Sequence, residues 1–234
     1  MTDPHNLSLR LESVTKRYSR APIFLPVTFE ANQGEIVAIT GANGSGKSTL
    51  LKIIAGVALP TKGICEWKRG SIKLEPRELQ ITSGFVSPYL ELYNELTAVE
   101  HVRFVGELQG REISGDEAIE ELSAFGLDKD IASGNRPMKQ YSSGMQQRVR
   151  LAMAFISQPK VLFLDEPSSN LDEEGIGTLF QRIEKSSRSG ALIMIATNDE
   201  REKKLAAREI VLLPFSNHHT DVIARSPLAD DVAI

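Results

Sequence analysis

The stretch that decides the fold is Gly41-Ala42-Asn43-Gly44-Ser45-Gly46-Lys47-Ser48-Thr49. Its glycines let the backbone wrap closely around an anion, with the N–H groups pointing inward. The compact apolar run from Ile36 to Thr40 comes directly before it and predicts a strand buried on both faces of a sheet. Residues 48–55 predict a helix that ends at Gly56. A strand, a glycine-rich loop and a helix in this order predict a phosphate site at the positive end of the helix.

The composition is that of an ordinary globular protein, and it limits the possible functions. The chain has 234 residues, of which 41% are hydrophobic and 25% charged, so we expect one domain with an inserted subdomain. The net charge is -4 and basic residues do not cluster, which argues against a nucleic-acid surface. The single cysteine cannot form an internal disulfide and fits a reducing cytosol. The polar N-terminus and the short apolar runs predict neither a signal peptide nor a membrane span.

The rest of the chain alternates strands and helices, which predicts a largely parallel sheet covered on both faces. From about Thr97 to Ser157 the apolar residues recur at helical spacing, so we expect a helical insertion there. Residues 57–86 predict short strands and turns. Further strands are expected at 7–11, 23–29, 161–164, 191–196 and 210–213, with a helix at 175–187.

Two further motifs bear chemistry. Asp165 and Glu166 follow a buried apolar strand, and open α/β sheets bind ligands at that end of their strands. The alternative is an acidic helix cap, which the glycine-rich loop upstream makes less attractive. The second motif, Tyr141 to Arg148, opens a helix that Ser142 or Ser143 can cap, leaving the helix end open to an anion. On its own, this segment is merely a good helix start.

Together these motifs resemble the nucleotide-binding subunit of ABC transporters, from about residue 7 to residue 213. Residues 41–49 resemble the Walker A motif of that family, and residues 161–166 resemble Walker B with its catalytic glutamate. Residues 142–146 resemble the signature sequence, usually Leu-Ser-Gly-Gly-Gln, and residues 169–172 resemble the D-loop. The motif variants and the chain length also resemble the haem-exporter ATPases of cytochrome c biogenesis.

The resemblance implies an α/β fold with a P-loop NTPase core, which contains a mixed, mainly parallel sheet. A small antiparallel β subdomain and an inserted helical subdomain accompany the core. Residues 1–234 then form a single ABC ATPase domain. Its core covers about 7–88 and 158–213, its helical subdomain about 89–157, and a tail follows at 214–234.

The resemblance also assigns roles to residues. Glu166, Lys47 and Asn198 are expected to be catalytic, and Mg²⁺ is expected on Ser48 and Asp165. The expected ATP-binding residues are Tyr18, Gly41, Asn43, Gly44, Ser45, Gly46, Lys47, Ser48, Thr49 and Asp165, with Ser142, Ser143, Gly144, Met145 and Gln146 serving a partner's ATP. Tyr18 follows Lys16 and Arg17 where the family places an adenine-stacking aromatic, although a tyrosine there can also simply pack a strand.

For function, the resemblance implies an ATP-hydrolysing subunit that powers a separately encoded integral membrane permease. Two ATPase subunits, identical or different, would dimerise head-to-tail with each ATP between the Walker motifs of one and the signature of the other. The chain would be cytoplasmic and peripheral at the inner face of the membrane, with no nucleic-acid partner. Two alternatives stay open: a regulatory subunit that hydrolyses ATP slowly, and a non-transport ABC ATPase.

Two positions depart from the family pattern. Pro88 stands where a glutamine usually touches Mg²⁺ and the attacking water, and proline offers neither a side-chain ligand nor a backbone N–H. Ser87 and Tyr89 are the candidate substitutes. Asn198 stands in place of the switch histidine; it can donate a hydrogen bond but cannot carry a positive charge. We therefore expect ATP binding to be retained and hydrolysis to be slow, at least in a homodimer.

Other features are expected to have no site role. His218 and His219 have no metal-ligand companions nearby, Trp67 is expected to pack, and residues 199–204 are expected to form a solvated helix face.

Overall fold

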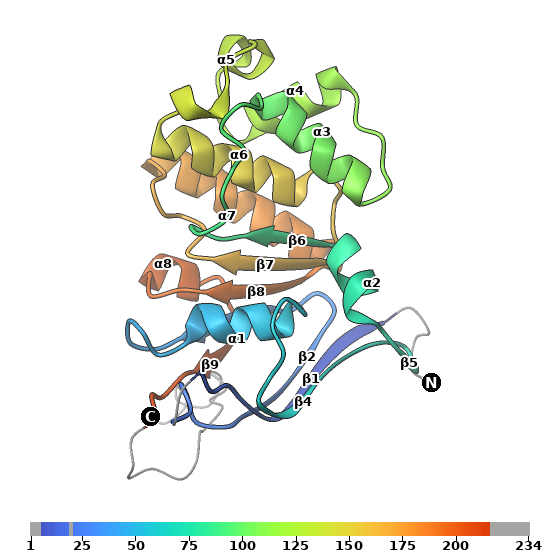
Figure 1. Cartoon of the computed structure of the whole chain (residues 1–234), viewed down its shortest axis with the longest axis vertical. Helices are drawn as coiled ribbons and strands as arrows, with labels where there is room; N and C mark the ends of the chain where they lie inside the picture. The colour runs from blue at the N-terminus through green and yellow to red at the C-terminus, as the bar shows by residue number, and fades with distance from the viewer. Residues whose placement is uncertain (1–5, 19–20, 216–234) are drawn as a thin grey trace, which may run out of the picture.

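A five-stranded parallel sheet forms the centre of the molecule (Figure 1). The computed structural model describes residues 6–18 and 21–215. The strand order is β6-β7-β8-β3-β9, so chain segments far apart in sequence lie side by side. The strands are β3 (Ile36–Thr40), β6 (Ser83–Val86), β7 (Val161–Asp165), β8 (Leu192–Ala196) and β9 (Arg208–Val211). Because all pairings are parallel, the carboxyl ends of β3 and β7 meet at one edge, on either side of β8.

A second, antiparallel sheet has the order β2-β1-β4-β5 and lies below the first in Figure 1. Its strands are β1 (Leu7–Thr15), β2 (Val27–Asn32), β4 (Lys62–Arg69) and β5 (Ile72–Lys73). The inward-facing residues of β1 and β2 alternate with exposed ones, as one-sided burial requires. Helix α1 (Lys47–Ile54) packs in the same core as both sheets, with Leu50 and Ile53 buried.

The central strands are buried on both faces, and their side chains alternate between two cores. Val161 and Phe163 of β7 face the core of α1 and the antiparallel sheet, whereas Leu162 and Leu164 face the helices on the other side. A strand covered on both faces has no polar side, which explains why these segments read as continuous apolar runs.

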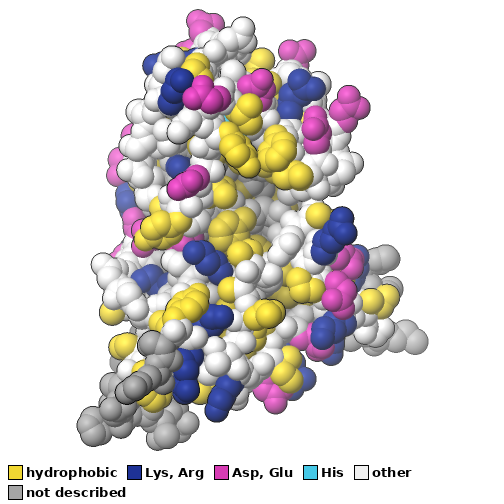
Figure 2. All heavy atoms as spheres, viewed as in Figure 1, with side chains coloured by type: hydrophobic (Ala, Val, Ile, Leu, Met, Phe, Trp, Pro, Cys, Tyr) yellow, Lys and Arg dark blue, Asp and Glu magenta, His cyan; other side chains and the backbone are white. Residues whose placement is uncertain are grey.

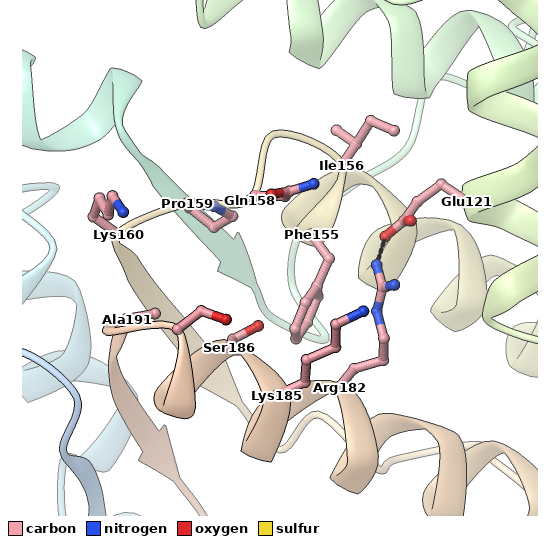
Figure 3. Close-up of a pocket in the computed structure, with 11 residues that line it drawn as sticks. Glu121, Phe155, Ile156, Gln158, Pro159, Lys160, Arg182, Lys185, Ser186 and Ala191 are labelled. Carbon is pink, nitrogen blue, oxygen red and sulfur yellow. Dashed lines mark hydrogen bonds and ion pairs between the residues drawn. The ribbon is translucent and has the colours of Figure 1, made fainter.

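The opposite face is covered by α7 (Glu173–Arg188) and by helices inserted between β6 and β7 (Figure 1). The inserted helices are α3 (Ala98–Leu108), α4 (Gly115–Ala124), α5 (Lys129–Ser133), η1 (Met138–Gln140) and α6 (Ser143–Phe155). Arg182 of α7 forms an ion pair with Glu121 of α4 and lies near the ring of Phe155 (Figure 3). Its guanidinium also lies over the ring of Phe125. This contact ties the inserted helices to the core, and desolvation by burial raises the pKa of Glu121.

The predicted fold class is confirmed, with local differences. Residues 76–81 form helix α2 (Pro76–Ile81) in a segment expected to hold only strands and turns; proline at the first helical position was the overlooked signal. The strand expected from residue 23 begins only at Val27, because Pro22 and Pro26 interrupt the ladder, and Phe24 makes an isolated bridge to Pro214. The last helix, α8 (Glu200–Lys203), precedes β9. None of the helices described is long and apolar enough to cross a bilayer.

Gly84 on β6 is predicted to be intolerant of a side chain. A Cβ at this position would lie 2.1 Å from the backbone oxygen of Ala154 on α6, and that backbone cannot move aside cheaply. Gly84→Ala should lower the free energy of unfolding by about 1–3 kcal/mol, measured by urea denaturation. The control is Gly177→Ala inside α7, where a Cβ meets open space; it should be neutral or stabilise by up to about 1 kcal/mol. Equal effects of the two substitutions would contradict this packing account.

Candidate functional site

The glycine-rich loop is shaped by glycine at the positions where a side chain would not fit. Gly46 caps α1 with a φ of 100°, in the left-handed region that favours glycine. A Cβ there would come within 2.8 Å of the side chains of Phe24 and Ile23. The loop thus rests on the segment around Phe24 and presents the N-terminus of α1 outward. The hydroxyl oxygen of Ser45 in this loop is buried and has no hydrogen-bond partner among the described residues.

Lys47 lies buried within the loop. Its Nζ donates to the backbone oxygens of Gly41 at 3.0 Å and Ala42 at 3.3 Å. Desolvation lowers the pKa of this ammonium, while the charges of Glu166 and Asp165 act in the opposite direction. A buried cation held by only two neutral acceptors has a strong preference for an anionic neighbour. The arrangement therefore suits a phosphate group next to the loop.

Asp165 at the end of β7 accepts hydrogen bonds on both carboxylate oxygens. Ser48 Oγ donates to Oδ1 at 2.9 Å, and Ser87 Oγ donates to Oδ2 at 3.3 Å. Asp165 is only 2% exposed, and burial raises its pKa although both hydrogen bonds favour the charged form. The structure thus brings the two predicted metal-binding residues, Ser48 and Asp165, into direct contact.

Glu166 follows directly and is exposed on the edge of a cavity of about 320 Å³. Its φ of 46° is uncommon for a residue other than glycine and costs about 1–3 kcal/mol. The backbone holds it there, because its N–H donates to Ala196 and its carbonyl accepts from Ser169. Three predicted motifs each contribute a residue to the same cavity: Asn43, Ser169 and Asn198. The cavity is also lined by Ser168, Thr197, Asp199 and Glu202.

Asn198 lies within reach of the glycine-rich loop. Its Nδ2 donates to Oδ1 of Asn43 at 2.6 Å, across 155 positions of sequence. Both side chains are exposed at the cavity. The asparagine at the switch position therefore contacts the loop itself, and an incoming phosphate at this point would compete for the same amide.

The predicted signature residues lie apart from the chain's own loop. Ser142 caps α6 by accepting from the backbone N–H of Met145, and both Ser142 and Ser143 are exposed. Gly144 abuts the D-loop segment, since a Cβ there would meet the backbone oxygen of Asn170 at 2.7 Å. Gln146 donates to the carbonyl of Tyr141. Within the described residues, no hydrogen bond joins 142–146 to 41–49.

Tyr18 and Thr49 are the remaining predicted ATP-binding residues. Tyr18 is 72% exposed with the Lys16 ammonium 5.1 Å from its ring centre, so it does not pack in a strand as the alternative proposed. Its role toward adenine stays a prediction. Thr49 is half-buried in the first turn of α1. His218 and His219 lie outside the described residues.

Glu202 was misjudged from the sequence. The expectation of a solvated face at residues 199–204 is wrong here, because this side chain is 1% exposed and lines the cavity. Its Oε1 accepts from the backbone N–H of Ser168, and burial raises its pKa. One glutamate within a run of polar residues gives no sign in the sequence that it is buried. Only the packing of α8 shows that Glu202 is buried.

The donor set at the loop fits a magnesium ion. Ser48, Asp165 and Ser87 offer hard oxygen atoms, which Mg²⁺ prefers, and the ion ordinarily keeps several waters beside one or two carboxylates. Across residues 6–18 and 21–215, the structure contains no group of three His, Cys, Asp or Glu side chains able to hold a metal. The nucleotide phosphates would therefore have to complete such a site.

Comparison with known proteins agrees with this geometry. The family model for the ABC transporter domain matches residues 24–169, which is more than half of the chain. The chain belongs to the ABC transporter family. It is an ATP-binding cassette, that is, the ATPase component of this family.

Curated relatives and solved structures give the same result. The chain is 32% identical over 198 residues to the lantibiotic transport ATP-binding protein SrtF of Streptococcus pyogenes, covering 81% of this chain and 80% of that one. It is 35% identical over 176 residues to the cytochrome c biogenesis ATP-binding export protein CcmA of Haemophilus ducreyi, covering 74% and 81%. A dimeric post-hydrolysis structure of the ATP-binding cassette MJ0796, bound to ADP and Pi, superposes with a TM-score of 0.77 at 31% identity, covering 87% and 94%.

Lys47 is predicted to supply most of the electrostatic attraction for the nucleotide. Lys47→Ala should weaken ATP binding at least about tenfold, because hydrogen bonds to charged groups contribute about 1.5–3 kcal/mol. Fluorescence titration with a labelled ATP analogue measures this. Lys185→Ala, an exposed lysine on α7, is the matched control and should bind normally. Unchanged affinity in Lys47→Ala would contradict the assignment.

Proposed function

We propose that this cassette binds ATP with Mg²⁺ and hydrolyses it to drive a separately encoded membrane permease. The observation that carries the proposal is the meeting of Lys47, Ser48, Asp165 and Glu166 at one edge of the sheet. Lys47 would neutralise the outer phosphates, and Ser48 with Asp165 would hold Mg²⁺. Glu166, exposed at the cavity edge, would polarise the attacking water as general base.

A second ATPase subunit is part of the proposal. Ser142 and Ser143 are exposed at the N-terminus of the 13-residue helix α6, where backbone N–H groups and the helix dipole favour an anion. No hydrogen bond among the described residues connects them to the chain's own loop. Two copies arranged head-to-tail would place this helix end on the partner's ATP. The MJ0796 cassette was solved as a dimer, which supports this arrangement.

A groove beside the inserted helices suits the permease. It has a volume of about 620 Å³ and lies between α2, β6, α3 and the segment after β6. Figure 2 shows hydrophobic side chains gathered around this hollow. Exposed apolar residues that line it are Ile81, Tyr93, Phe104 and Leu108. Contiguous exposed apolar surface of this kind marks an interaction site. A cytoplasmic location, peripheral at the inner face of the membrane, follows from this proposal.

We further propose that hydrolysis is slow. Asn198 carries no charge, and losing a positive charge next to the developing phosphoryl transition state weakens its stabilisation. Pro88 cannot replace a glutamine ligand. A subunit that binds ATP and hydrolyses it slowly is the second candidate function, and in a heterodimer its signature would complete an active site on a better-equipped partner.

If the groove binds a permease, the chain should bind an integral membrane protein. Tagged chain added to detergent-solubilised native membranes should recover one, and Leu108→Glu should abolish recovery, because a charge would have to be desolvated in the contact. Ile72→Glu is the control, since Ile72 is 69% exposed on β5 and does not line the groove. Recovery of no membrane protein, or equal recovery with both variants, contradicts the proposal.

The uncharged side chain of Asn198 leads us to expect slow ATP hydrolysis. Steady-state ATP turnover of the purified chain should lie below about 1 s⁻¹, at the low end for enzymes. Asn198→His should raise it by about tenfold or more, because it restores a group that can carry charge at the phosphate. Asn198→Ala is the control and should not raise the rate. Fast turnover that is unchanged in Asn198→Ala would contradict the prediction.

A further inference from the structure

Ser87 occupies a place at the site that the sequence motifs do not assign. Strand β6 pairs with β7 in parallel, with Val86 opposite Leu164, so the next residue along each strand brings Ser87 beside Asp165. Ser87 is only 2% exposed. A serine buried to this extent needs a hydrogen-bonding role to offset the cost of its desolvation.

That role is directed at the predicted metal-binding carboxylate. Ser87 Oγ donates to Asp165 Oδ2 at 3.3 Å, while Ser48 Oγ donates to Oδ1 at 2.9 Å. The carboxylate thus lies between two hydroxyls, one from the glycine-rich loop's helix and one from the end of β6. The same Ser87 oxygen accepts from the backbone N–H of Tyr89 at 3.3 Å, and the Ser87 carbonyl accepts from Leu90 at 3.0 Å.

Pro88, the next residue, leaves the site without the glutamine side chain of the family pattern. Pro88 stands where the family pattern has a glutamine, and it contributes no side-chain ligand. The exposed Tyr89 side chain lies near Lys52 of α1, with the ammonium 5.8 Å from the ring centre, and within the described residues it makes no hydrogen bond to Asp165. Of the two candidate substitutes, only Ser87 therefore contacts the metal-binding carboxylate.

We infer that Ser87 is a positioning residue for the nucleotide's divalent cation: its hydroxyl orients the Asp165 carboxylate that would hold the ion, at a site where Pro88 supplies no ligand. This inference rests on the proposed function, because it requires a nucleotide with its metal at Ser48 and Asp165. Ser48 and Asp165 offer hard oxygen donors, and removing a group that orients a metal ligand typically changes metal affinity about 10- to 100-fold.

Manganese is the probe that tests the inference, because its EPR signal distinguishes free from bound ion. The full chain is saturated with a non-hydrolysable ATP analogue and titrated with Mn²⁺. Ser87→Ala should weaken Mn²⁺ binding about tenfold, while affinity for the analogue in EDTA stays at the wild-type value. Ser83→Ala is the matched control: Ser83 is also buried, at the first position of β6, but its Oγ donates to the carbonyl of Gln80 and not to Asp165. It should bind Mn²⁺ normally.

The outcomes separate the inference from the proposed function. Wild-type Mn²⁺ affinity in Ser87→Ala, with normal binding of the analogue, overturns the inference and leaves the proposed function standing. No binding of the analogue by the wild-type chain overturns both. Ser87→Cys, nearly isosteric but with a thiol that is only a weak hydrogen-bond donor to the carboxylate, gives a second measurement should the alanine variant fail to fold. It should lose Mn²⁺ affinity as well, and full retention counts against the inference.

Discussion

The hydrogen bond from Ser48 Oγ to Asp165 Oδ1 is the contact on which the site depends. It joins segments 117 positions apart in the sequence, at a distance of 2.9 Å. Only a parallel sheet that places the carboxyl ends of β3 and β7 at one edge, with β8 between them, brings these residues together. Lys47, Glu166, Asn198 and Ser87 reach the same edge for the same reason, because each follows a strand of this sheet directly or through a short loop.

Burial at this edge of the sheet shifts the pKa values of the charged side chains that would bind the ligand. Desolvation lowers the pKa of Lys47 and raises the pKa of Asp165, so both charged forms are held at a cost in the free chain. A phosphate next to the lysine and a divalent cation next to the carboxylate would remove that cost. The Lys47 contacts with Gly41 and Ala42, and the amide pair of Asn198 with Asn43, are the interactions that such a ligand would replace.

Much of the fold could be predicted from the sequence because the central strands are apolar on both faces, and the glycine-rich loop has few alternative uses. The helix at Pro76–Ile81 was missed because six residues carry too little periodicity, although a proline stands at its first position. The residues of the candidate site also fall into those that could be predicted from the sequence and those that could not. Residues in contiguous motifs, such as Lys47 and Ser48, were predictable. Glu202 was missed because its burial depends on contacts with Ser168 from a distant segment, and Ser87 was one of two open candidates.

We propose that the glycine-rich loop binds ATP soundly while the residues that promote its hydrolysis are altered. A single-turnover experiment tests both halves at once: excess protein is mixed with radiolabelled ATP and Mg²⁺, and bound nucleotide is separated and identified over time. We expect rapid retention of nucleotide that stays ATP for far longer than about one second, the slow end of typical turnover. Failure to retain nucleotide, or conversion of bound ATP to ADP well within that second, would contradict it.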